Sequence, residues 1–65
     1  MSDVEGLKAE IKKLSAKAIQ AKMDLHDLSE ELPINWESIM TVAQKTHDTY
    51  AELEKKRADL KQLEA

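Results

Sequence analysis

The 65-residue sequence contains no cysteine and no phenylalanine, and it has only one glycine and one proline. Without cysteine, the chain cannot form disulfides, zinc–thiolate sites or a cysteine nucleophile. Aromatic residues make up only 3% of the sequence, which is too few for the core of a β-sandwich or barrel. A chain of this length forms a single domain, and such small domains gain stability from oligomerisation, a metal or very regular helix packing.

The sequence also has no apolar run long enough to cross a bilayer, which takes about 20 residues. Its first residues do not show the basic-then-apolar layout of a secretory signal. We therefore expect a cytoplasmic protein that does not contact membranes.

The helical pattern of the sequence is broken at one place, around Pro33, near the middle of the chain. The sequence therefore predicts one all-α domain over residues 1–65, with a helix at about 3–32, a turn at 33–35 and a second helix at about 36–64. Ser2 and Glu5 have the spacing of a capping box at the first helix. Asn35 is a predicted N-cap for the second helix, and Thr41 with Gln44 forms another predicted capping box.

Apolar residues recur at alternating steps of three and four along the first helix. This spacing is typical of a helix that supercoils against another helix. A weaker stripe of the same kind runs along the second helix, so the two helices should pack as an antiparallel hairpin. The first stripe comprises Val4, Leu7, Ile11, Leu14, Ala18, Ala21, Leu25, Leu28 and Leu32.

A hairpin of two long helices leaves the outer edges of such stripes in water, so we expect two hairpins to form a four-helix bundle. A further apolar set, Ala9, Ala16, Ile19 and Met23, lies on the opposite side of the first helix. This set indicates either scattered surface residues or a second interface that makes a tetramer. The residues predicted at the oligomer interface are Leu7, Ile11, Leu14, Ala18, Ala21, Leu25 and Leu28.

Two histidines are the candidates for a metal site. His26 lies one helical turn before Glu30, and a hairpin turning at 33–35 can bring His47 toward His26. Imidazole and carboxylate ligands suit a divalent transition metal such as nickel, zinc or iron. The alternative is that both histidines are solvated surface residues.

Charge is unevenly distributed along the chain, whose net charge is −3. Five lysines lie within residues 1–22, whereas residues 23–40 contain five carboxylates and neither lysine nor arginine. Nucleic-acid binding through the lysines is not favoured, because the chain is acidic overall and has almost no aromatic residue to stack on bases. Trp36, in the turn, is either a lid over the end of the bundle or an anchor for a protein partner.

No phosphate loop or nucleophile motif is present, so we do not expect an enzyme. The chain does resemble a known family in its Leu-His-Asp-Leu segment at 25–28, its Leu-Pro-x-Asn-Trp turn at 32–36 and residues 42–46. These segments are similar to a small Rop-like family encoded in bacterial nitrogen-fixation gene clusters. The heptad stripes alone would match any helical hairpin.

The resemblance implies a Rop-like hairpin that assembles into a four-helix bundle and an accessory role in nitrogen fixation. Some members of the family are metalloproteins, and His26 lies within the matching segment. The expected function is therefore that of a non-enzymatic homo-oligomer, which binds a transition metal or docks onto a nitrogenase or cluster-assembly protein. The alternatives are a Rop-like RNA-binding dimer and a metal-free scaffold for protein interactions.

Overall fold

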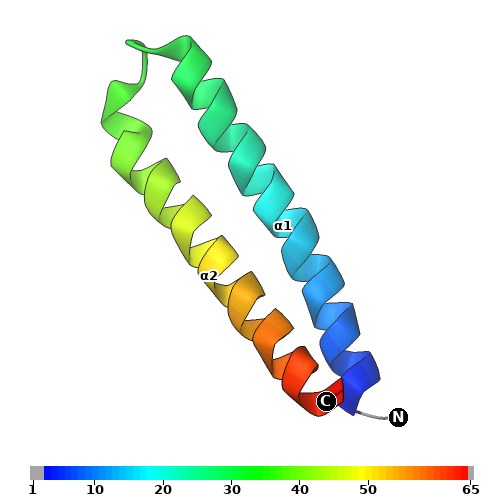
Figure 1. The fold of residues 1–65 in the computed structure, drawn as a ribbon. Coiled ribbons are helices and arrows are strands. Elements are labelled where there is room, and N and C mark those ends of the chain that lie inside the picture. The colour runs from blue at the N-terminus through cyan, green and yellow to red at the C-terminus, as the bar shows by residue number, and fades with distance from the viewer. Residues whose placement is uncertain (1–2, 65) are drawn as a thin grey trace.

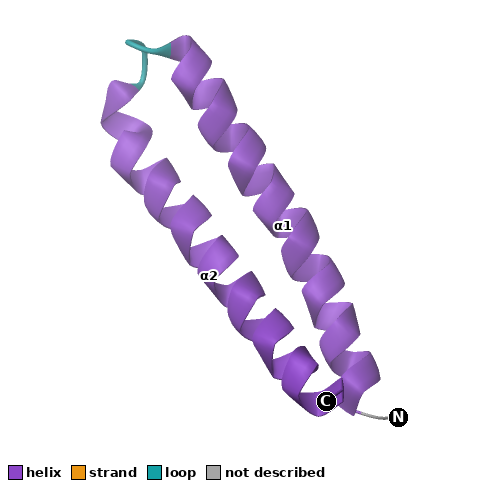
Figure 2. Cartoon of the chain, in the orientation of Figure 1, coloured by secondary structure: helices purple, strands orange, loops and turns teal. Residues whose placement is uncertain are grey.

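The computed structural model describes residues 3–64, which form two long antiparallel helices joined by a tight turn (Figures 1 and 2). Helix α1 spans Asp3–Glu31, a short 3-10 helix η1 spans Trp36–Ser38, and helix α2 spans Ile39–Glu64. The hairpin is a rod of 48 × 14 × 13 Å with the turn at one end and both chain termini at the other. The prediction of an all-α antiparallel hairpin is confirmed.

Helix α1 begins at Asp3, and Ser2 of the predicted capping box lies outside the described residues. Asp3 and Glu5 in the first turn interact favourably with the positive end of the helix dipole. The helix ends at Glu31, one residue before the predicted end, because a residue that precedes proline is disfavoured in helical geometry. The last turn of α1 carries no basic residue.

The turn is held by its own backbone hydrogen bonds. The amides of Ile34, Trp36 and Ser38 donate to the carbonyls of Glu31, Pro33 and Asn35 over 3.0, 3.4 and 2.9 Å. The Leu32–Pro33 peptide bond is cis. These contacts give the turn a defined shape between the two helices.

Asn35 directs the chain into η1 from a left-handed conformation, with φ 63° and ψ 22°. Asparagine adopts this region more readily than most residues. The prediction that its side chain caps the following helix is wrong, because Nδ2 donates to Glu31 Oε2 over 3.2 Å instead. The Asn35 side chain therefore ties the turn back to the end of α1.

The second capping box is also absent, because α2 has already begun at Ile39 when the chain reaches Thr41. Gln44 donates through Nε2 to Asp48 Oδ1 over 2.8 Å, one turn further along the same helix. The short helix η1 thus connects the turn to the start of α2.

The core lies in the middle of the rod. Leu14 and Ala18 of α1 pack with Leu53 of α2, and Ile11 and Tyr50 extend this cluster at its edges. The small side chain of Ala18, which is 1% exposed, allows the two helices to approach closely here. The heptad stripes of the two helices therefore face each other within one chain.

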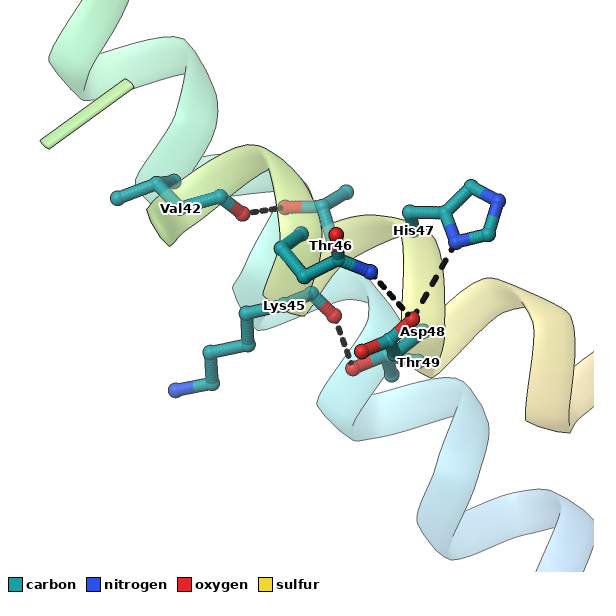
Figure 3. Close-up of polar contacts among 7 residues, drawn as sticks. Val42, Lys45, Thr46, His47, Asp48 and Thr49 are labelled. Carbon is teal, nitrogen blue, oxygen red and sulfur yellow. Dashed lines mark hydrogen bonds and ion pairs between the residues drawn. The ribbon is translucent and has the colours of Figure 1, made fainter. Parts of the chain in front are cut away.

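A polar contact crosses the helix interface on the turn side of this core. The Thr46 hydroxyl lies 2.8 Å from the carbonyl of Val42 on its own helix and 3.3 Å from the carbonyl of Ala21 on α1. Figure 3 shows the bond to Val42. A half-buried threonine in the α2 stripe is thus satisfied by backbone oxygens of both helices.

Candidate functional site

The seven residues predicted at the oligomer interface all lie on the face of α1 that packs against α2. Four of them are buried within a single chain: Leu14, Ala18, Ala21 and Leu28. The other three are half-buried: Leu7, Ile11 and Leu25. This stripe closes the hairpin, and the part of it left for another chain is the exposed edge of the half-buried residues.

The second apolar set of α1 is uncovered in a single hairpin. Ile19 is 57% exposed and Met23 is 54% exposed, and Ala9 and Ala16 are exposed as well. An open groove on one side of the hairpin exposes part of the packed stripe between the helices. It is lined by Leu14, Lys17, Gln20, Ala21, Asp24, Lys45, Thr49 and Glu52.

The structure brings only two of the three predicted metal ligands together. His26 Nε2 lies 2.9 Å from Glu30 Oε1 on the surface of α1, and both side chains are about two-thirds exposed. His47 contacts Asp48 instead, with Nδ1 3.3 Å from Oδ1 (Figure 3). No group of three histidine, aspartate or glutamate side chains that could hold a metal ion occurs within residues 3–64. Of the predicted ligands, the structure therefore places His26 beside Glu30 and His47 elsewhere.

The turn end of the rod displays large apolar side chains. Trp36 is 62% exposed, so within a single hairpin it does not cover the end of the core. Leu32, expected in the packed stripe of the first helix, is 41% exposed, and Ile34, Ile39 and Met40 were not predicted to join Trp36 at the surface. We define the apolar tip as the exposed residues Leu32, Ile34, Trp36, Ile39 and Met40.

The two ends of the rod differ in charge. The turn end carries the five carboxylates of residues 23–40 with no lysine or arginine among them. Toward the chain termini, basic residues are paired with carboxylates across the helices: Lys8 with Glu64 at 3.5 Å and Lys56 with Glu10 at 3.2 Å. Arg57 lies 3.3 Å from Glu54, one turn earlier on α2.

The described part of the chain shows no deep polar site. Within residues 3–64, no polar or charged side chain is buried. Neither helix in this range is long and apolar enough to cross a membrane. The functional surfaces that the geometry offers are therefore the exposed apolar set on α1, the side groove and the apolar tip.

Known proteins similar to this chain share both its sequence and its fold. A family model described as Rop-like matches residues 2–65. A UPF0437 protein of Azorhizobium caulinodans is 66% identical over the whole of this chain and 94% of its own length. A structure solved by NMR as a structural-genomics target is 48% identical, covering 98% of this chain and 90% of its own, with a TM-score of 0.88.

A third relative carries information on gene context. A protein of Frankia alni is 47% identical over 78% of this chain and 62% of its own length. It is described as a UPF0437 protein in the nifX-nifW intergenic region. That relative is thus encoded among nif genes.

Proposed function

This chain belongs to the Rop-like family, and on that premise we propose that it is a non-enzymatic, cytoplasmic accessory protein of nitrogen fixation that acts by binding other proteins. The position of the Frankia alni relative between two nif genes supports the proposed role in nitrogen fixation. The exposed apolar surface supports the mode of action. Among residues 3–64, eight large apolar side chains are exposed, whereas Leu14, Leu28 and Leu53 are the large ones that are buried. That surplus of exposed apolar surface is the observation that carries the proposal.

The proposed working form is a homo-oligomer in which two hairpins make a four-helix bundle. The half-buried edges of Leu7, Ile11 and Leu25 would be covered by the second hairpin. The exposed pair Ile19 and Met23 would then either remain at the surface or join two such bundles into a tetramer.

Sedimentation equilibrium tests the assembly. We expect a mass of two or four chains, and a double Ile19→Ser and Met23→Ser variant should reduce four chains to two without loss of helicity. A folded chain that stays single at every concentration would contradict the proposed bundle.

The role in nitrogen fixation is tested by deleting the gene in a nitrogen-fixing bacterium that carries it. Growth on dinitrogen should slow while growth on ammonium is unchanged, and the gene supplied in trans should restore the rate. Equal growth of the deletion and parent strains on both nitrogen sources would contradict the proposed role.

Transition-metal binding is a second candidate function, favoured by the His26–Glu30 pair at 2.9 Å. Because residues 3–64 of one chain group no three candidate ligands, a metal bound through His26 and Glu30 would have to be shared between chains, with both residues supplied by each. The test is the ratio of nickel, zinc or iron to protein after dialysis. One ion for every two chains, lost on His26→Ala, would support this candidate, and no retained metal would contradict it.

We do not expect nucleic acid to be the partner. The chain carries a net charge of −3, and Lys8 and Lys56 are held by carboxylates of the same hairpin. Phosphate binding needs an uncompensated basic face and weakens steeply with salt. A salt-sensitive shift of RNA mobility by the purified protein would contradict this expectation.

A further inference from the structure

We propose that the apolar tip is a docking surface for a protein that presents an apolar groove bordered by lysine or arginine side chains. The identity of that partner as a nitrogen-fixation protein rests on the proposed function, whereas the surface and the chemistry of its partner do not. The tip would dock end-on and leave the sides of the rod free for a second hairpin.

The first observation is the display of apolar surface at the tip. Ile34, Trp36 and Met40 are 67%, 62% and 79% exposed. Tryptophan and methionine are enriched in the buried centres of protein interfaces, and tryptophan is the commonest type of hot-spot residue. The tip thus exposes the kinds of side chain that proteins use to anchor partners.

The second observation is that the turn holds these side chains in place. Three backbone hydrogen bonds cross the turn, and the Asn35 side chain donates to Glu31. A surface that is ordered before it binds loses less conformational entropy on association. The turn is therefore built to present its apolar side chains.

The third observation is the placement of acidic charge. Glu30 and Glu31 lie in the last turn of α1, and Glu37 follows in η1, whereas the last turn of α1 has no basic residue. Carboxylates at the negative end of a helix dipole are unfavourable, so Glu30 and Glu31 are placed against the dipole of α1, whereas Glu37 lies ahead of α2. A local charge placement that disfavours the fold is expected at sites that serve function. We call Glu30, Glu31 and Glu37 the acidic rim.

The acidic rim selects the partner. Carboxylates repel the phosphates of nucleic acids and of anionic lipids, and they attract a surface with lysine or arginine around an apolar centre. A second copy docked tip to tip is a poor match, because the two acidic rims would then face each other. A different protein with a basic border satisfies both the apolar and the charged parts of the tip.

Site-specific photo-crosslinking in a nitrogen-fixing host tests the proposal. The photoreactive residue benzoylphenylalanine replaces Trp36 in one strain and Met40 in a second strain. A third strain carries it in place of Leu63, which is 53% exposed at the opposite end of the rod. Circular dichroism of each purified variant confirms that it is helical, and mass spectrometry identifies the crosslinked protein and peptide.

We expect Trp36 and Met40 to crosslink to the same protein, at a site that combines apolar residues with lysine or arginine, and Leu63 not to do so. Changing both Glu31 and Glu37 to lysine should lower the yield of this adduct by roughly tenfold, because like charges would then face each other. Changing Glu54 and Asp59, which are exposed on α2 away from the tip, to lysine is the matched control and should leave the yield unchanged.

The outcomes separate this inference from the proposed function. Adducts to a partner unrelated to nitrogen fixation, with the expected position and charge dependence, would support the docking surface and contradict the proposed process. Adducts only with a second copy of this chain, an equal yield from Leu63, or a yield that does not respond to reversal of the acidic rim would overturn the docking surface. Those results would leave the gene-deletion test of the proposed function untouched.

Discussion

The middle of the rod and its tip both contain apolar side chains, but those in the middle are buried and those at the tip are exposed. In the middle, Leu14, Ala18 and Leu53 interlock between the two helices and are at most 9% exposed. At the tip, Trp36 of η1 and Met40 in the first turn of α2 are mostly exposed to solvent. Hydrophobicity therefore marks two different kinds of region in this protein, one that forms the hairpin and one that remains available.

Charge separates the two regions as clearly as burial does. Beside the core, Lys56 pairs with Glu10 across the helices, so the charges there favour the hairpin. At the tip, Glu30 and Glu31 face the negative end of the helix dipole without a basic residue in the same turn. The charges beside the core thus pair across the helices, whereas Glu30 and Glu31 at the tip are placed unfavourably for the dipole of α1.

Placing a charge in the middle should have the largest effect. Ala18→Asp buries a carboxylate at a position that is 1% exposed, and we expect the hairpin to unfold, because a buried unpaired charge costs more than a small domain's whole stability. The control is Ala16→Asp, at an exposed position of the same helix. Circular dichroism during urea titration compares the two variants. A folded Ala18→Asp chain would contradict the assignment of the core.

Opening a cavity in the middle should have the next largest effect. Leu53 is 2% exposed, so Leu53→Ala should lower the free energy of unfolding by about 2–5 kcal/mol. Leu63→Ala removes the same atoms from a side chain that is 53% exposed and should change it by less than about 0.5 kcal/mol. Equal effects of the two substitutions would show that the core does not lie in the middle of the rod.

The turn should be sensitive to its backbone geometry. Asn35 has a φ of 63°, which a β-branched residue adopts only with strain, so Asn35→Val should destabilise the hairpin by about 1–2 kcal/mol. Asn35→Gly loses the bond to Glu31 but accepts this conformation freely, and it should be less destabilising than valine. If thermal unfolding gave the same midpoint for both variants, the left-handed turn would be disproved.

Removing apolar side chains from the tip should have the smallest effect on folding. Because Trp36 and Met40 are mostly exposed, Trp36→Ser and Met40→Ser should each change the free energy of unfolding by no more than about 0.5 kcal/mol. Urea titration checks this value. A loss of several kcal/mol would mean that the tip belongs to the packed core.

Much of the fold follows from the sequence because a heptad stripe and a single proline leave few alternatives. The alternating spacing along α1 predicts which residues pack, and Pro33 predicts where the chain turns. The details of the turn could not be predicted, because Asn35 can cap a helix or adopt a left-handed conformation, and tertiary context decides between them. In this structure Asn35 adopts the left-handed conformation, and its side chain donates a hydrogen bond to Glu31 instead of capping the helix.

The candidate site was less predictable than the fold. A heptad position does not say whether its side chain packs within one chain or between chains, and the structure places Ala18 and Ala21 within one hairpin. The spacing of His26 and Glu30 correctly brings those two side chains together, but the position of His47 depends on the rotation of α2 about its axis. The heptad pattern does not reveal the tip, because Leu32 continues the first stripe and yet is exposed at the turn, in a segment without basic residues.

The most direct test of the contrast between a packed middle and an available tip is the accessibility of Trp36, the protein's only tryptophan. Acrylamide quenching of its fluorescence would be measured over protein concentrations that span assembly of the chain. We predict that Trp36, which is 62% exposed, is quenched readily and to the same extent at every concentration, because the second hairpin covers the sides of the rod. A blue-shifted emission that becomes protected as the chains assemble would contradict this account, since it would mean that the chain covers its own tip.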